Sequence, residues 1–109
     1  MPTVFKHAVN SGLGITPTDV IQIDAGIRAT VIGMNLVNVT DNVITTDIFV
    51  YDSSSTVAYY AKELIIPPNT TLKVITQGEK LILPEGSGLR IASSEDNSID
   101  STVSYVEIS

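Results

Sequence analysis

Several residue types on which common chemistries depend are absent or scarce in this chain of 109 residues. It has no cysteine and no tryptophan, and His7 is its single histidine. Without cysteine there are no disulfides, thiolate zinc sites or cysteine nucleophiles. One imidazole without partners makes neither a zinc site nor a convincing Ser-His-Asp triad. The sequence therefore predicts no catalytic residues, no metal site and no cofactor.

Charged residues are also scarce. They make up 17% of the chain, against roughly 25% in ordinary soluble domains, and the net charge is −6. Binding to a nucleic-acid backbone needs clustered lysine and arginine, so we expect no nucleic-acid partner. No apolar run approaches the roughly 20 residues of a membrane span. Residues 1–15 lack the pattern of a secretory signal, so we expect no membrane partner and synthesis in the cytoplasm without a signal peptide.

β-Branched residues are what the chain has in excess, with 14 Ile, 12 Val and 12 Thr. Their stiff side chains suit the pleated surface of a sheet. Residues 44–51 alternate with a period of two, which places Ile44, Thr46, Ile48 and Val50 on one dry face. Residues 28–39 are apolar on both faces, which predicts a central strand or a strand covered by a partner subunit.

Turn-forming clusters, such as residues 77–79, separate about eight apolar runs at a spacing typical of sandwiches and barrels. The expected strands lie at residues 19–23, 28–39, 44–51, 57–64, 71–75, 80–83, 89–92 and 102–108. No segment has helical periodicity, so we predict an all-β fold, an antiparallel β-sandwich of jelly-roll or Ig-like type. Residues 1–15 have no clear period, so we expect an extended N-terminal arm there and the β-sandwich domain in residues 16–109.

Two acidic groups suggest chemistry of their own. Asp41, Asp47 and Asp52 lie close together in the sequence, and two carboxylates suffice for acid–base hydrolysis, but their turn and strand contexts favour surface positions. Residues 95–100 have the oxygen-rich composition of a calcium loop, yet they lack the ligand run of an EF-hand and are better interpreted as a solvated loop. We therefore do not expect an enzyme.

Aromatic residues offer one candidate binding surface. Cross-strand aromatic pairs are ordinary stabilisers of sheets, and carbohydrate-binding domains more often use tryptophan, which is absent here. Sheet packing is the favoured interpretation, and a carbohydrate- or receptor-binding module is the alternative. The residues of this candidate ligand platform are Phe49, Tyr51, Tyr59 and Tyr60.

Four short motifs carry a resemblance to a known class of protein. They are the Asn-Val-Thr that ends a strand at residues 38–40, the proline-rich hairpin start at 66–72, the Leu-Pro-Glu-Gly turn at 83–86, and the final Ser-Tyr-Val-Glu-Ile at 104–108. From about residue 16 onward the chain resembles the small β-rich virion structural proteins of tailed bacteriophages. The resemblance implies a non-enzymatic virion component in the neck or collar, in the tail, or on the capsid as a decoration protein.

Such a component would contact copies of itself and other virion proteins, and either a trimer or a hexamer suits the pattern. Arms of this kind can add a strand to the sheet edge of a neighbour, and closed assemblies hide edge strands that are an aggregation liability alone. The residues expected at the subunit interface are Val4, Phe5, Val9, Leu13 and Ile15 in the arm, and Met34, Leu36, Val103 and Tyr105 in the strands.

Overall fold

The computed structural model describes residues 3–75 and 80–109, and this part of the chain consists of strands and turns without a helix. The strands are β1 (Thr3–Leu13), β2 (Thr18–Gln22), β3 (Arg28–Asn38), β4 (Ile44–Tyr51), β5 (Val57–Ile66), β6 (Thr71–Ile75), β7 (Leu81–Leu83), β8 (Gly88–Ser93) and β9 (Ile99–Ile108). The predicted all-β class is confirmed. The turn expected at residues 77–79 lies outside the described residues.

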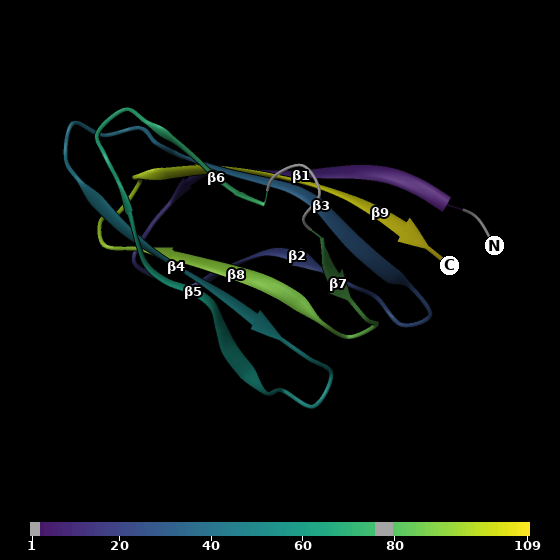
Figure 1. The fold of residues 1–109 in the computed structure, drawn as a ribbon. Coiled ribbons are helices and arrows are strands. Elements are labelled where there is room, and N and C mark those ends of the chain that lie inside the picture. Colours follow the sequence, from purple (N-terminus) through teal and green to yellow (C-terminus); the bar gives the residue numbers. More distant parts are fainter. Residues whose placement is uncertain (1–2, 76–79) are drawn as a thin grey trace.

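The strands form two antiparallel sheets that lie as two layers (Figure 1). The five-stranded sheet has the order β1-β9-β3-β6, and β7 pairs with the same side of β3 as β6, at the opposite end of that strand. The four-stranded sheet has the order β2-β8-β4-β5. Nearly every neighbouring pair therefore joins strands that are distant in sequence. The start of β1 and the end of β9 lie at the same end of the molecule (Figure 1).

Residues 1–15 are the segment in which the sequence predicts an extended N-terminal arm. Their described part forms β1, which pairs with β9 of the same chain in unbroken register from Thr3 opposite Ile108 to Asn10 opposite Ser101. Leu13, at the end of β1, is only 5% exposed. Most side chains before it are exposed on both faces of the strand. An edge strand of this kind has no dry face, so the sequence has no period-two signal by which to recognise it.

The core lies between the two sheets and consists of one inward side chain at every second position of the central strands. The dry face predicted for residues 44–51 is confirmed at Ile44 and Ile48, which are at most 1% exposed. Each fully buried aliphatic side chain stabilises the fold by roughly 1.5–3 kcal/mol. The largest fully buried hydrophobic residues are Val31, Met34, Leu36, Ile44, Ile48, Ile66, Leu83, Leu89, Ile91, Ile99 and Val103.

Asn38 is the polar anchor of this core and gives the Asn-Val-Thr motif a structural role. Its side chain is fully buried at the end of β3. Its Nδ2 lies 2.7 Å from the carbonyl oxygen of Asn42 and 3.0 Å from that of Ile66, and its Oδ1 accepts hydrogen bonds from the backbone and hydroxyl of Thr40. Buried polar groups are stable only when bonded in this way. The motif therefore ties the end of β3 in one sheet to the end of β5 in the other and to the turn that precedes β4.

Candidate functional site

The outer face of the five-stranded sheet carries several exposed apolar side chains. Phe5 of β1 lies opposite Val106 of β9, Val106 lies opposite Thr30 of β3, and Thr30 lies opposite Ile82 of β7. The exposed fractions are 75% for Phe5 and 70% for Ile82, and Val9, four residues along β1, is 65% exposed. We call the following five residues the outer apolar patch: Phe5, Val9, Ile82, Val106 and Ile108.

Alternation along the strands explains why these side chains point outward. Val31, Leu83 and Val103 are fully buried between the sheets, so their neighbours in sequence project from the opposite face. Neighbouring strands lie about 4.8 Å apart, so the row from Phe5 to Ile82 spans about 14 Å. Large apolar side chains that are exposed together on one sheet face are typical of an interaction site.

The charges that border this patch are mainly positive, in a chain whose net charge is −6. Arg28 lies opposite Ile108, and Lys73 lies opposite Asn35 on the same side of the sheet. Asp100 lies at the far end of the strands, where its carboxylate accepts a hydrogen bond from the backbone of Gly12 at 2.9 Å. Among the described residues, no Asp or Glu lies opposite a member of the row from Phe5 to Ile82.

The expected interface residues fall into two groups in the structure. Val4, Phe5, Val9 and Ile15 are exposed, whereas Tyr105 is half-buried against the core. Four others are corrected, because they lie in the core of their own chain and have no surface to offer a neighbour. These residues are Leu13, Met34, Leu36 and Val103.

Sequence reasoning missed three members of the patch, namely Ile82, Val106 and Ile108. Residues 81–83 read as an apolar run, and only the pairing of β7 with β3 shows that Leu81 and Leu83 face inward while Ile82 faces outward. The same ambiguity affects β9, which has apolar residues on both faces. Their alternation was visible, but which of the two faces was covered was not.

The outer face of the four-stranded sheet is different, because charged and aromatic side chains contact one another across it. The Nε of Arg90 lies 2.8 Å from a carboxylate oxygen of Asp19, and its guanidinium lies 4.2 Å from the centre of the Tyr51 ring. The ring centres of Phe49 and Tyr59 are 4.8 Å apart. Each of these side chains therefore has a partner within the chain itself.

The Tyr51 ring packs closely against Gly88 on this face. Tyr51 is 8% exposed, and a β-carbon on Gly88 would overlap its ring and the carbonyl oxygen of Ile21. The Tyr51 hydroxyl has no hydrogen-bond partner among the described residues. Burial, followed by the negative charge of Asp19, raises the pKa of Tyr51 above its ordinary value.

The predicted ligand platform is therefore only partly assembled. Phe49 and Tyr59 stack as a cross-strand pair, and Tyr59 is 51% exposed. Tyr51 is covered by Arg90 and offers little of its ring. Tyr60 lies where the register between β4 and β5 shifts, beside the stacked pair rather than in it.

The acidic residues singled out in the sequence each make local hydrogen bonds. Asp47 accepts from the backbone of Glu63 at 2.8 Å, and Asp41 accepts from the side chain of Asn69 at 3.0 Å. Hydrogen bonds from the Ser54 hydroxyl and the Thr56 backbone lower the pKa of Asp52. These carboxylates hold turns and bulges in place.

The acidic loop at residues 95–100 binds the N-terminal segment of its own chain. Asp96 accepts a hydrogen bond from the backbone of Ile15 at 3.1 Å, and Asp100 accepts one from Gly12 at 2.9 Å. Glu95 accepts a hydrogen bond from the side chain of Asn42 at 3.1 Å. Across residues 3–75 and 80–109, no three His, Cys, Asp or Glu side chains are grouped as metal ligands would be.

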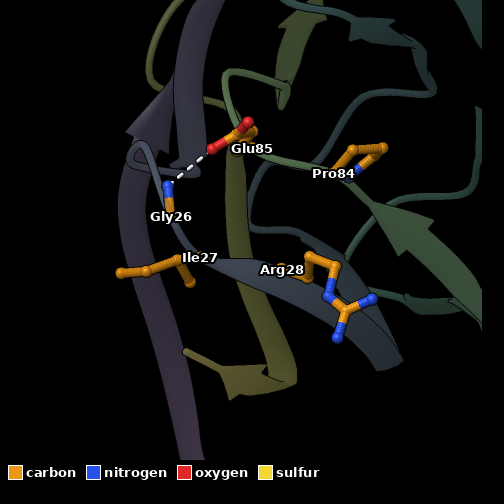
Figure 2. Close-up of a pocket in the computed structure, with 5 residues that line it drawn as sticks. All are labelled: Gly26, Ile27, Arg28, Pro84 and Glu85. Carbon is orange, nitrogen blue, oxygen red and sulfur yellow. Dashed lines mark hydrogen bonds between the residues drawn. The ribbon is translucent and has the colours of Figure 1, made fainter.

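An open depression of about 400 Å³ lies between the β2–β3 turn and the turn that follows β7 (Figure 2). The backbone nitrogen of Gly26 donates to the carboxylate of Glu85 at 2.6 Å across it. Figure 2 shows the guanidinium of Arg28 directed away from Glu85. Pro84 and Ile27 complete the lining, so this depression brings no nucleophile together with a base.

Comparison of the chain with family models, with curated proteins and with solved structures finds no match. Within the part of the chain that the structure describes, no helical segment has the length and hydrophobicity that crossing a bilayer requires.

Proposed function

We propose that this chain is a non-enzymatic structural component of a tailed-phage virion that assembles by packing its outer apolar patch against neighbouring subunits. The observation that carries the proposal is the row from Phe5 to Ile82, where two large apolar side chains are 75% and 70% exposed on one continuous sheet face. The N-terminal strand supplies Phe5 and Val9 to this surface, so N-terminal contacts remain part of the mechanism. The neck or collar, the tail and the capsid surface are the candidate positions, as the sequence resemblance implies.

The strand orders support a jelly roll as the type of fold. Strands β6 and β7 share one side of β3, so each sheet has four strand positions and the chain has eight in all, the number in a double-sheet jelly roll. An Ig-like arrangement pairs the first two strands in one sheet, whereas β1 and β2 lie in different sheets here. Viral capsid domains use jelly rolls, but so do lectins, so the fold alone does not assign the function.

The experiment compares one isoleucine on each sheet face. Ile82 is 70% exposed in the outer apolar patch, and Ile65 of β5 is 66% exposed on the outer face of the four-stranded sheet. We expect Ile82→Glu to weaken self-association at least about tenfold, because a buried isoleucine contributes roughly 1.5–3 kcal/mol. We expect Ile65→Glu, the matched control, to leave it unchanged. Light scattering over a range of concentrations measures the mass of each variant.

Equal thermal stability of the two variants is the internal control, because both side chains lie on the surface. A wild-type chain that stays monomeric at every concentration, alone and with other virion proteins, would contradict the proposal. So would an oligomer that tolerates Ile82→Glu but is lost with Ile65→Glu, because the interface would then lie on the other sheet.

A carbohydrate- or receptor-binding module is the second candidate, and the exposed Phe49–Tyr59 pair favours it. Aromatic faces of this kind stack on sugar rings, but the platform lacks Tyr51, whose ring Arg90 covers. Binding to a glycan array that Tyr59→Ala abolishes would support this function, and an array without bound glycans would exclude glycan recognition.

A further inference from the structure

The edges of the two sheets are protected to different degrees, and β1 is the least protected of them. A free edge strand pairs readily with another chain unless it is short, bulged, or guarded by charge or proline. Strand β2 has five residues and a register shift, β5 has two register shifts, and β6 and β7 have five and three residues. Strand β1 has eleven residues, and the first eight run in unbroken register.

The side chains of β1 do not guard its edge. Residues 3–13 contain no proline and no acidic residue. Lys6 is the only Lys, Arg, Asp or Glu of the strand, and its ammonium lies 2.8 Å from the carboxylate of Glu107 on β9. That ion pair draws the lysine towards its own sheet. The free edge therefore presents backbone hydrogen-bonding groups between exposed apolar side chains.

We propose that β1 pairs with β1 of a second copy of this chain, antiparallel and about a two-fold axis at His7, so that the two five-stranded sheets join edge to edge. This inference rests on the proposed function and names its first contact. Two exposed apolar residues lie at equal distances from His7, since Phe5 precedes it by two positions and Val9 follows it by two. An antiparallel two-fold at His7 therefore sets Phe5 against Val9 of the partner subunit, twice.

The distribution of charge supports a second copy of this chain as the partner of the β1 edge. The chain carries a net charge of −6, so two copies of it repel each other overall. Strand β1 contains no carboxylate of its own, and the Glu107 carboxylate beside it is paired with Lys6. Pairing there brings no unpaired carboxylates of the two strands together. It also extends the outer apolar patch across the axis, because Phe5 and Val9 belong to it.

The edge pairing favours the hexamer over the trimer, the two oligomers that the sequence suggests. A trimer with a single three-fold axis has no two-fold axis, whereas a hexamer built as a trimer of dimers has three. The edge pairing supplies the dimer, and the remainder of the outer apolar patch, which includes Ile82, is left to join the dimers. We therefore expect a dimer or a hexamer in solution.

Cysteine cross-linking tests the register on a clean background, because the chain has no cysteine of its own. Residues opposite each other in an antiparallel pair have Cα atoms about 4.5–5.5 Å apart, within the usual range for a disulfide. We expect His7→Cys to form a covalent dimer with itself under mild oxidation. We expect Phe5→Cys alone and Val9→Cys alone not to do so, because each lies about 13 Å from its own copy. A mixture of these two variants should cross-link.

Ile65→Cys is the matched control, since Ile65 is exposed on β5, an edge strand of the other sheet, and sets the level of random collision. Non-reducing gel electrophoresis measures the covalent dimer, and we expect at least tenfold more of it from His7→Cys than from Ile65→Cys. An equal yield from the two would overturn the edge pairing, and so would cross-linking of Phe5→Cys with itself.

The outcomes separate the two proposals. If the wild-type chain forms an oligomer that Ile82→Glu weakens, while His7→Cys does not cross-link, the edge pairing is wrong and the proposed function stands. If His7→Cys cross-links but no larger assembly responds to Ile82→Glu, the edge pairing stands and the role of the patch fails. A chain that is monomeric and does not cross-link contradicts both.

Discussion

The outer faces of the two sheets differ in how charged side chains are placed among their apolar and aromatic residues. On the four-stranded sheet, Arg90 covers the ring of Tyr51 and pairs with Asp19, so that charges interrupt the apolar surface. On the five-stranded sheet, the row from Phe5 to Ile82 contains no charged residue. The first face contains charge and ring contacts within one chain, whereas the row on the second exposes Phe5 and Ile82 without such contacts among the described residues.

The largest effect on stability is expected from substituting a glycine on the four-stranded sheet, compared with a glycine on the five-stranded sheet. Gly88 lies under Tyr51, where an added β-carbon overlaps the ring and the Ile21 carbonyl, whereas the nearest atom to a β-carbon on Gly33 would be 3.9 Å away. We expect Gly88→Ala to destabilise the fold by about 3 kcal/mol, since overpacking against backbone forces strands apart. We expect Gly33→Ala to be neutral or stabilising by up to about 1 kcal/mol. Urea unfolding measures both, and a Gly88→Ala variant as stable as wild type would show that Tyr51 is not seated there.

The contacts of Arg90 on the four-stranded sheet predict a smaller change in stability. Replacing Arg90 with Met keeps much of the side chain over Tyr51 but removes the ion pair with Asp19 and the cation–π contact. We expect a loss of about 1 kcal/mol, because both contacts are partly exposed. Lys62→Met is the control, since Lys62 lies 5.1 Å from the centre of the Tyr59 ring and should cost less. Thermal unfolding should rank the variants in that order, and the reverse order would contradict this account.

The smallest expected effect is the ionisation of Tyr51 at alkaline pH. Because burial and the charge of Asp19 raise its pKa in the folded state, the unfolded chain releases this proton first as the pH rises. The stability that depends on neutral Tyr51 is therefore complete below the ordinary tyrosine pKa of about 10 and is lost as the pH climbs through the raised value. Ultraviolet titration should show a late-ionising tyrosine signal that Tyr51→Phe removes. Tyr51→Phe should also make alkaline unfolding less steep.

The alternation of apolar and polar residues along the strands made the all-β class predictable. The same alternation does not show which face of a strand is buried when both faces are apolar. Residues 44–51 have one apolar and one polar face, so the inward set could be predicted, and Ile44 and Ile48 are buried accordingly. Residues 28–39 are apolar on both faces, and their pattern alone does not show that Met34 and Leu36 belong to the core rather than to an interface. A period of two shows that two faces exist but does not say which one lies against the other sheet.

The candidate surface was predictable in part for the same reason. Phe5 and Val9 could be predicted as interface residues because they are large apolar residues in a segment whose pattern predicts no buried face within the chain. Ile82 could not, because its contribution depends on the pairing of β7 with β3 some fifty residues earlier in the chain. The expected arm became an edge strand because β9 offers it an unbroken ladder of backbone hydrogen bonds, which no local pattern in residues 1–15 reveals.

By itself, the sequence determined the all-β class, the positions of most strands and the absence of the side chains needed for thiol chemistry, since these follow from residue type and local periodicity. Only the tertiary structure decided which apolar face is buried, which residues form a row across β1, β9, β3 and β7, and which edge is left open. Those properties belong to pairings between strands distant in the chain, and the hydrophobic effect that drives them acts on surfaces without regard to sequence order.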